Sequence, residues 1–410
     1  MTGPKLFFQK DSEKTGKNSL LDESLKIREE FLLDPNYPPR QKRCFKKLMP
    51  LIYWLAFIIV IAFSIYISFT VIYHQLYPSH KIRHWREFEK FREEFKNADF
   101  GYRFGNDLPF REKHFEENLE FIEECRRNNP GVNFSVNQFA DWGEEKMRGI
   151  FLSDDHLRIN NYYKIGDAKD DEQVLDVPDS FDWRSSKSPM VTPVKNQGDC
   201  GSCWAFAVVA AIETQYAMKK GALLSLSEQE LVDCDVLSYG CNGGYLNTAL
   251  LFAIEKGLET EADYPYVAIQ HKQCSIQTQK IRVKIDDGYH LKANEDQIAD
   301  WVAREGPVSF CKLLLFLFFF KFFKCSVMPV PKSIMFYRGG IFNPSMAECR
   351  GQAVGNHVMA IVGYGREGNQ KYWIVKNSWG TSWGEQGYLK MARGVNICGF
   401  TNYVFAPHIN

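Results

Sequence analysis

Two cysteines stand three positions apart in the stretch QGDCGSCWAF, directly before a long apolar run. Cys200 and Cys203 could form half of a metal site, a redox pair, or one disulfide half beside one nucleophile. A zinc site needs a second pair of ligands at short spacing, and the next pair, Cys234 and Cys241, is too widely separated for that. A thioredoxin-like redox pair would follow a βαβ start, which the sequence around these cysteines does not supply. The third interpretation is favoured, and we expect no metal and no cofactor.

The position of Cys203 favours a reactive thiolate. This cysteine precedes WAFAVVAAIETQYAMK, whose apolar, Ala-rich pattern predicts a helix that begins at the cysteine itself. Exposed amides and the dipole at a helix N-terminus lower the pKa of a thiol, and a nearby imidazolium lowers it further. Two residues far along the chain could complete such a site, His357 in NHVMAIVGYG and Asn377 in KNSWG. Taken alone, His357 would be interpreted as a buried core histidine and Asn377 as a turn residue.

Together, the motifs QGDCGSCWAF, NHVMAIVGYG and WIVKNSWG resemble those of the papain/cathepsin family of cysteine proteases. In that family the His and Asn follow the Cys by about 130–150 residues, and here they lie slightly further on. The resemblance covers residues 177–410 and, more loosely, residues 85–151. It implies an α+β, papain-like two-lobe fold, in which a mostly helical left lobe carries the cysteine and a β-barrel-like right lobe carries the histidine and asparagine.

The same resemblance implies a role for each catalytic residue. Cys203 would be the nucleophile that forms an acyl-enzyme, and His357 would hold its thiolate as an ion pair and then protonate the leaving amine. Asn377 would orient the imidazole, and Trp379 would cover their hydrogen bond from water. The side-chain amide of Gln197 would form the oxyanion hole with the backbone N–H of Cys203. The implied reaction is hydrolysis of peptide bonds in proteins and peptides.

The resemblance also implies a substrate cleft, lined by Gly201, Gly243, Gly244, Tyr245, Leu246, Val358, Trp379 and Tyr403. The two consecutive glycines would let a substrate backbone approach closely, because no side chain intrudes. The pocket for the residue two before the scissile bond would be formed by Tyr245, Leu246, Val358 and Tyr403. Because these residues are apolar or aromatic, we expect hydrophobic side chains in that pocket rather than arginine. No inserted loop with a histidine follows Cys241, which favours an endopeptidase.

Disulfides are the next implication of the resemblance. It pairs Cys200 with Cys241, Cys234 with Cys274, and Cys349 with Cys398. Each disulfide would contribute about 2–4 kcal/mol to stability. Cys125 is left over as a buried thiol. In SLSEQELVDC, Ser227 and Glu230 have the spacing of a capping box, which predicts a second helix at that point.

The overall composition narrows the function classes. The chain has 410 residues, with 50 Lys+Arg against 50 Asp+Glu, so its balanced charge does not favour nucleic acid as a partner. Its 11 cysteines, most of them after residue 199, favour an oxidising compartment. No internal repeats are found. We expect several parts along the chain and a monomeric peptidase domain at residues 177–410.

An uncharged apolar stretch, Leu51 to Tyr73, predicts a membrane span near the start of the chain. About 20 apolar residues cross the hydrocarbon core as a helix, and the long polar segment before this stretch argues against a cleaved signal peptide. Its N-terminal flank carries the basic residues Arg40, Lys42, Arg43, Lys46 and Lys47. The positive-inside rule then places the tail, residues 1–50 and predicted to be disordered, in the cytosol. We expect a single-pass type II membrane protein with a lumenal, lysosomal or extracellular peptidase domain, in which Asn133 of NFS is a glycosylation sequon.

Residues 74–152 are predicted to form a linker and an inhibitory propeptide. WREFEKFREEF and FREKHFEENLEFIEECRR place apolar residues three and four apart, as amphipathic helices do, and VNFSVNQFADW indicates a short strand and a turn. The family's propeptide pattern is matched by Arg111, Phe115, Asn118 and Ile122, but Asp107 stands where Glu is usual and Arg126 where Asn is usual. By resemblance, the propeptide would lie through the cleft as an inhibitor and be released in acid as paired carboxylates protonate. The polar residues 153–176 would be the activation linker.

One stretch, CKLLLFLFFFKFFKCSV at residues 311–327, disagrees with its surroundings. In the family, a segment like GPVSF is soon followed by one like FYRGGIF, without such a block between them. The block is too short and too often interrupted by Lys for a second membrane span, and as an exposed loop it would be prone to aggregation. Because its Phe, Leu and Lys codons would be rich in A and T, we interpret it as an aberrant insertion from a retained intron. The alternatives are a real insertion closed by a Cys311–Cys325 disulfide, or a degenerate, inactive copy.

Two function classes stay open on the sequence. The first is a cysteine endopeptidase made as a membrane-anchored zymogen of the secretory or endolysosomal route. The second is a catalytically inactive homologue that acts as a binding or scaffold protein, which is suggested by the block at 311–327 and the departures in the propeptide. Covalent labelling of Cys203 by an epoxide inhibitor of the family would discriminate between them.

Overall fold

The computed structural model describes residues 39–76, 85–95, 108–152, 165–168, 177–277, 279–280, 282–311, 313–314, 324–325 and 328–410. The chain divides into two compact units, Met1–Ile82 and Arg83–Asn410. The helices of the second unit are α3 (Trp85–Phe95), α4 (Leu108–Asn128), α5 (Glu144–Gly149), α6 (Cys203–Lys220), α7 (Glu228–Cys234), α8 (Leu246–Glu255), α9 (Glu295–Arg304) and α10 (Met346–Gly351). Its 3₁₀ turns are η2 (Trp183–Ser185), η3 (Gly240–Asn242), η4 (Lys332–Phe336) and η5 (Ile397–Asn402).

The strands of the second unit are β1 (Val132–Phe134), β2 (Gly166–Asp167), β3 (Phe181–Asp182), β4 (Asp287–Leu291), β5 (Val308–Cys311), β6 (Leu313–Leu314), β7 (Lys324–Cys325), β8 (Met328–Pro331), β9 (Tyr337–Phe342), β10 (Ala353–His357), β11 (Met359–Glu367), β12 (Gln370–Lys376), β13 (Tyr388–Ala392) and β14 (Tyr403–His408). The largest sheet has the order β1-β9-β13-β12-β11-β5-β14-β4-β2, with β3 also paired to β11. The pairs β13–β9 and β2–β4 are parallel. Helices and a mainly antiparallel sheet in one unit agree with the predicted α+β class.

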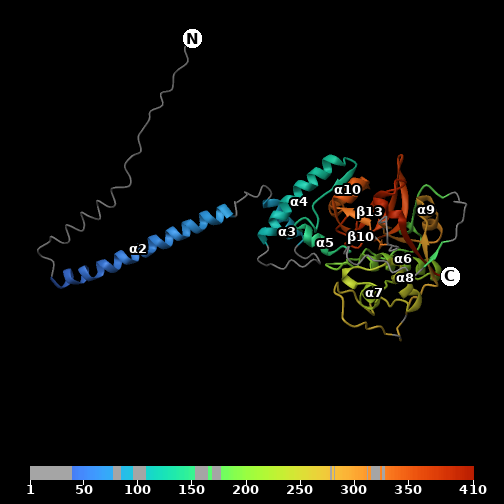
Figure 1. Cartoon of the computed structure of the whole chain (residues 1–410), viewed down its shortest axis with the longest axis horizontal. Helices are drawn as coiled ribbons and strands as arrows, with labels where there is room; N and C mark the ends of the chain where they lie inside the picture. The colour runs from blue at the N-terminus through green and yellow to red at the C-terminus, as the bar shows by residue number, and fades with distance from the viewer. Residues whose placement is uncertain are drawn as a thin grey trace, which may run out of the picture. The chain divides into compact units, whose positions relative to one another are not determined.

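In the first unit the described part is one helix, α2 (Pro39–Leu76) (Figure 1). Its stretch Tyr53–Thr70 has a mean hydropathy of 2.0 and no buried residue, so by length and composition it could cross a membrane. The prediction that residues 39–50 are disordered is wrong, because they are helical up to the start of the apolar stretch. Arg, Lys, Gln and Leu, which favour helix, dominate that segment, and Pro50 is the one helix breaker within it. Residues 1–38 of the predicted tail lie outside the described residues.

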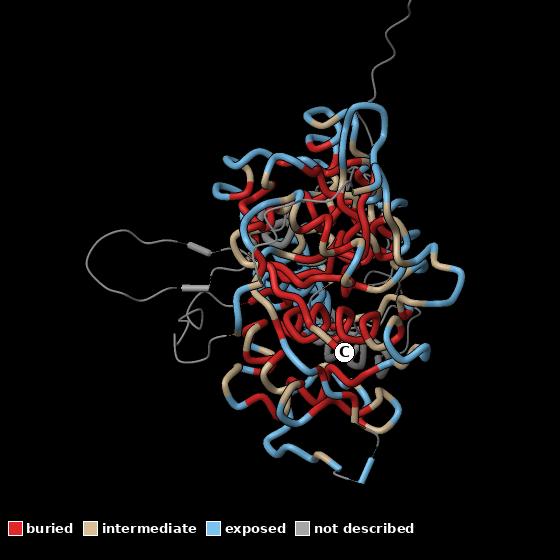
Figure 2. Tube along the Cα trace, turned by 90° about the vertical axis from the view of Figure 1, so that its right-hand side faces the viewer, coloured by how far each residue is buried: buried red, intermediate tan, exposed pale blue. Residues whose placement is uncertain are grey.

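Two hydrophobic clusters form the interior of the second unit. One joins α6, α7 and α8 and includes Trp204, Leu231 and Ala249. The other lies on the large sheet and includes Trp373 and Trp383. Figure 1 shows α6, α7 and α8 gathered on one side of this unit, with β10 and β13 on the other, and Figure 2 shows buried chain inside and exposed loops around it. The two sides correspond to the helical and β-rich lobes expected from the sequence.

The segment before the main domain packs onto it as a small domain. Phe115 of α4 lies between Phe88 and Phe91 of α3, with ring centroids 5.1 and 5.0 Å away. The Asn118 side chain donates to the carbonyls of Ala140 and Trp142, both at 2.9 Å. Strand β1 pairs antiparallel with β9 of the main domain. The amphipathic helices of this segment lack a complete core of their own. These contacts explain why the segment still folds.

Two charged residues of this segment also have structural partners. Arg111 and Asp141 form an ion pair at 2.8 Å, and only 1% of the Asp141 side chain is exposed. Arg126, which departs from the family pattern, donates from Nε to the Phe134 carbonyl at 2.8 Å and so ties α4 to β1. Asp107 lies outside the described residues. The departure at Arg126 therefore does not remove a contact between the helix and the following strand.

Local caps place the first two helices of the main domain. Helix α6 begins at Cys203, as predicted, and ends at Gly221, whose φ of +70° suits a residue without a side chain. Helix α7 begins after Ser227, whose hydroxyl accepts from the Glu230 N–H at 3.0 Å. The predicted capping box is only half formed, because the Glu230 carboxylate pairs with Arg282 and accepts from the Glu259 N–H instead.

Both strands beside the unusual block at 311–327 are paired in the structure. Strand β5 lies between β11 and β14, and β8 pairs with β10, which ends in His357. Inside the block, β6 pairs antiparallel with β7. The rest of the block, and the side chains of Cys311 and Cys325, lie outside what the structure describes. The block therefore lies between a strand of the largest sheet, β5, and a strand of a separate two-stranded sheet, β8, and both keep their partners.

Candidate active site

The nucleophile candidate occupies the position that the sequence predicts. Cys203 is the first residue of α6, and its thiol contacts the backbone N–H of Val358, the residue after His357. Cys200 forms a disulfide with Cys241, so it is not a redox partner of Cys203. The other two expected disulfides, Cys234–Cys274 and Cys349–Cys398, are also present. In the described part of the chain, no cluster of His, Cys, Asp and Glu could hold a metal ion.

The imidazole of His357 is held from two sides. Its Nε2 lies 2.7 Å from Oδ1 of Asn377, just beyond the end of β12. The ring of Trp379 stacks on the imidazole with centroids 4.6 Å apart, and this indole is fully buried. Nδ1 of His357 has no hydrogen-bond partner among the described residues. The asparagine therefore fixes the ring orientation and leaves Nδ1 for the thiol.

Gln197 is positioned by both lobes. Its Oε1 accepts from the Ser378 hydroxyl at 2.7 Å, and its Nε2 donates to the Cys200 carbonyl at 2.8 Å. The same Nε2 donates at 2.8 Å to the carbonyl of Ile150, in the segment before the main domain. An amide that already binds a backbone carbonyl beside Cys203 is suited to bind the oxyanion of a substrate.

One residue behind this loop, Tyr266, was not predicted from any sequence pattern. Its hydroxyl donates to the Gln197 carbonyl at 2.7 Å and lies 2.6 Å from the Ser202 hydroxyl. The oxyanion-hole candidate and the residue before the nucleophile are thus tied to one phenol. Only the tertiary structure brings the YPY segment that carries Tyr266 to this loop.

Residues Ile150, Phe151 and Leu152 occupy the cleft between the lobes. The Leu152 N–H donates to the Asn356 carbonyl at 3.0 Å. The Phe151 ring meets the His357 imidazole edge to face, with centroids 5.6 Å apart. The Leu152 side chain belongs to a buried cluster with Tyr245, Leu246 and Val358, and Tyr403 packs against that cluster. Four residues expected to line a substrate pocket therefore belong to, or pack against, the same buried cluster as this leucine.

The three glycines expected in the cleft have different reasons for lacking a side chain. A Cβ at Gly201 would lie 2.9 Å from the Phe151 carbonyl oxygen, and a Cβ at Gly243, where φ is +125°, would lie 3.3 Å from Leu152. A Cβ at Gly244 would instead lie 2.3 Å from the Trp204 ring. The contact of Gly244 with a substrate backbone stays a prediction, and the missing side chain also leaves room for an internal tryptophan.

Burial changes the ionisation expected at the catalytic pair. Both side chains are fully buried in this state of the protein. Burial raises the pKa of the Cys203 thiol to about 12, and burial lowers the pKa of His357 to about 4 although the Asn377 hydrogen bond opposes that shift. Burial therefore favours a neutral thiol and a neutral imidazole in this state, and the thiolate–imidazolium pair stays a prediction for the opened cleft. Water and a charged partner must return before the thiolate can form.

A pH dependence of cleft opening follows from this buried histidine. In a Cys203→Ala variant, we expect the equilibrium constant for release of residues 150–152 to rise up to about 100-fold between pH 6.5 and pH 4. The closed state keeps His357 neutral down to a pKa of about 4, whereas in an opened cleft its pKa returns toward 6.5. The closed state is thus fully favoured above pH 6.5 and loses stability as the pH falls toward 4. Hydrogen exchange at the Leu152 amide measures the opening.

The alanine background is needed for this measurement. In the wild type, the thiol can give its proton to His357 on opening, so the number of bound protons would not change. The control is the double variant Cys203→Ala/His357→Gln, in which carboxylates of the segment still titrate. Equal pH profiles for the single and double variants would show that His357 does not contribute.

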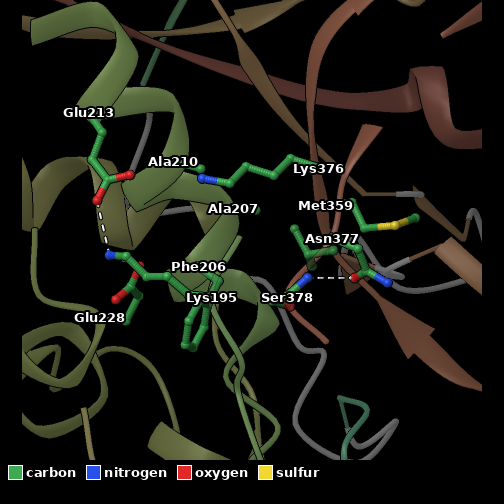
Figure 3. Close-up of a pocket in the computed structure, with 11 residues that line it drawn as sticks. Lys195, Phe206, Ala207, Ala210, Glu213, Glu228, Met359, Lys376, Asn377 and Ser378 are labelled. Atoms are coloured by element: carbon green, nitrogen blue, oxygen red, sulfur yellow. Dashed lines mark hydrogen bonds and ion pairs between the residues drawn. The ribbon is translucent and has the colours of Figure 1, made fainter. Parts of the chain in front are cut away.

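A buried polar cluster supports the site from below (Figure 3). Lys195 pairs with Glu213 of α6 at 3.0 Å and with Glu228 of α7 at 2.8 Å. Lys376 of β12 donates to the Thr192 hydroxyl at 2.8 Å, and Figure 3 shows its chain extending toward α6. Burial raises the pKa of Glu228 to about 8 even though the ammonium of Lys195 opposes the shift. The cluster joins the strand before Asn377 to the loop before Gln197, so it fixes the two lobes relative to each other.

Comparison with known proteins gives one consistent result. Residues 177–408 match the family described as papain family cysteine protease. Cysteine proteinase 1 of Dictyostelium discoideum is 33% identical over 336 residues, which is 77% of this chain and 89% of that protein. Cathepsin F of Mus musculus is 38% identical over 282 residues, 68% of this chain and 55% of that protein. The solved structure of digestive procathepsin L2 from Tenebrio molitor larval midgut superposes with a TM-score of 0.67 at 31% identity, over 79% of this chain and 99% of that one.

Proposed function

This chain belongs to the papain family of cysteine proteases, and we propose that it is a cysteine endopeptidase made as a membrane-anchored zymogen. The papain-like fold, the protease class and a propeptide before the protease domain are shared with its relatives. The location in the membrane, the substrate preference and the roles of individual residues are our proposals. The observation that carries the substrate preference and the residue roles is the passage of Ile150–Leu152 through the cleft that holds Cys203 and His357.

We propose that catalysis begins when this segment leaves the cleft. The thiol of Cys203 transfers its proton to Nδ1 of His357, and the thiolate attacks the carbonyl carbon of the scissile peptide bond. The negative oxygen that forms is stabilised by the Gln197 side-chain amide and the Cys203 backbone N–H. His357 then protonates the leaving amine, and water hydrolyses the acyl-enzyme. Asn377 and Trp379 hold the imidazole in place throughout.

Substrate preference is predicted from the pocket around Leu152. We expect substrates with Leu or Phe two residues before the scissile bond to have a kcat/KM about 10- to 100-fold higher than those with Arg there. The pocket of Tyr245, Leu246 and Val358 is apolar and buried, and an unpaired guanidinium would lose its hydration there. A positional substrate library measures this preference in the processed enzyme. Equal cleavage of substrates with Arg and with Leu two residues before the scissile bond would contradict the inference that the residues around Leu152 form this pocket.

Membrane anchoring is the second element of the proposal. It is supported by the exposed apolar stretch Tyr53–Thr70 and by the basic residues before it. With the N-terminus in the cytosol, the peptidase domain would lie in the lumen of the secretory or endolysosomal route, where its disulfides are stable. Asn133, which is exposed on β1, would then carry an N-glycan. Absence of glycosylation together with release of the intact chain by alkaline carbonate would contradict this topology.

The inactive-homologue alternative is weakened by the geometry around the block. Both flanking strands are paired and His357 is held, so nothing in the described structure breaks the site. The retained-intron interpretation of residues 311–327 stays a hypothesis, which a cDNA that reads through the block unchanged would refute. A folded, acid-processed protein that takes no epoxide label on Cys203 would favour the scaffold function.

A further inference from the structure

A short part of the activation linker pairs with a strand of the main domain, and that strand is distant in sequence from the catalytic residues. Strand β2, within residues 153–176, lies parallel to β4, with Gly166 opposite Tyr289 and Asp167 opposite His290. The Ala168 N–H donates to the His290 carbonyl at 3.0 Å. No sequence pattern predicts this strand. The linker therefore has an anchor of its own, besides the residues that fill the cleft.

The docked segment also has side-chain contacts. Ile165 packs against the helical cluster, and its Cδ1 lies 3.4 Å from where a Cβ at Gly288 would stand, next to Leu250. Gly288 thus leaves room for the isoleucine. Asp167 and Nδ1 of His290 lie 3.3 Å apart, but 85% of the Asp167 side chain is exposed, so this pair contributes little. Ile165 and the backbone pairing are the main contacts.

The strand on which the linker docks, β4, is also held by pairing within the main domain. The opposite edge of β4 pairs with β14 along the register from Leu291–Val404 to Asp287–His408. Beside β4 lies a cavity of about 310 Å³, lined by Ala168 together with Tyr289, Gln297 and Trp301. When the linker leaves, the free edge of β4 would present unpaired backbone groups, which is the arrangement that accepts an added strand, next to a hollow lined by both apolar and charged side chains.

We propose that the free edge of β4, with the room above Gly288 and the adjacent cavity, is a second peptide-docking site, whose occupant is the linker segment Ile165–Ala168. The site holds the linker on the zymogen and persists on the mature domain, where the released linker peptide rebinds. This inference rests on the proposed function only in that processing removes the linker. It adds a binding site outside the catalytic cleft.

The test on the mature enzyme uses protein whose cleft is blocked by an epoxide on Cys203. A fluorescent peptide of residues 161–172, NYYKIGDAKDDE, is titrated and its anisotropy followed. We expect saturable binding, at least tenfold weaker for the Ile165→Asp peptide and within about twofold for the Gly166→Ala peptide. Gly166→Ala is the matched control, because a Cβ there would meet nothing within 4 Å. No saturable binding, or equal binding of the Ile165→Asp peptide, would overturn the proposal.

A second measurement uses the full chain and requires no activity. Hydrogen exchange at the Ala168 amide should be slow in the intact zymogen and at least tenfold faster in the Ile165→Asp variant, but unchanged in Gly166→Ala. Fast exchange in the wild-type zymogen would overturn the docking even if the enzyme is active. Slow exchange in a chain that takes no epoxide label would instead reject the proposed catalysis and keep the docking site.

Discussion

Replacing Cys203 by alanine should reduce peptide hydrolysis by about 10⁴-fold or more. In the proposed mechanism Cys203 forms the acyl-enzyme, whereas His357 and Asn377 only move and orient a proton. The variant should still fold, because alanine fills most of the space of a small buried side chain at the start of α6. The measurement is hydrolysis of a peptide with Leu two residues before the scissile bond, together with labelling by an epoxide after acid processing.

The matched control for this variant is Cys125→Ala. Cys125 is also a free, buried cysteine, but it lies on α4, and burial raises the pKa of its thiol to about 12. After processing, the labelling and the activity of the Cys125 variant should equal those of the wild type. Retained activity in Cys203→Ala, or wild-type label found on Cys125, would place the nucleophile elsewhere and contradict the mechanism.

The parts of the site that the sequence predicted are those set by local patterns. An apolar run after Cys203 predicts the start of α6, and the motifs around His357 and Asn377 each lie where a strand ends. Such signals survive in a single sequence because they involve neighbouring residues. The pairing of distant cysteines came from resemblance, and the three disulfides in the structure agree with it.

What the sequence did not predict depends on contacts between distant segments. Strand β2 is two residues long and has no alternating pattern, so only its pairing with β4 reveals it. Gly244 also leaves room for the ring of Trp204, a contact that the local pattern does not indicate. The burial of Cys203 and His357, and the contact of Phe151 with the imidazole, likewise depend on segments that are distant in sequence.

The propeptide should lose most of its hold on the cleft when Phe115 is replaced by alanine. Phe115 is 1% exposed and packs between Phe88 and Phe91, and removal of a buried phenylalanine costs about 3–5 kcal/mol. Because α3 and α4 support the chain that leads to Phe151, this cost falls on the closed zymogen and not on the mature domain. We expect the open fraction at neutral pH to rise about 100- to 4000-fold.

The rate at which an epoxide labels Cys203 in the unprocessed zymogen measures that open fraction, since the thiol is fully buried when closed. The matched control is Phe110→Ala on the same helix, where the side chain is 65% exposed and the rate should change less than about threefold. Processed enzyme from both variants should label at the wild-type rate, which separates loss of inhibition from misfolding of the peptidase domain. If Phe115→Ala labels no faster than Phe110→Ala, the aromatic packing of α3 and α4 does not hold the cleft closed, and the contacts of Gln197 and Leu152 within the cleft must suffice.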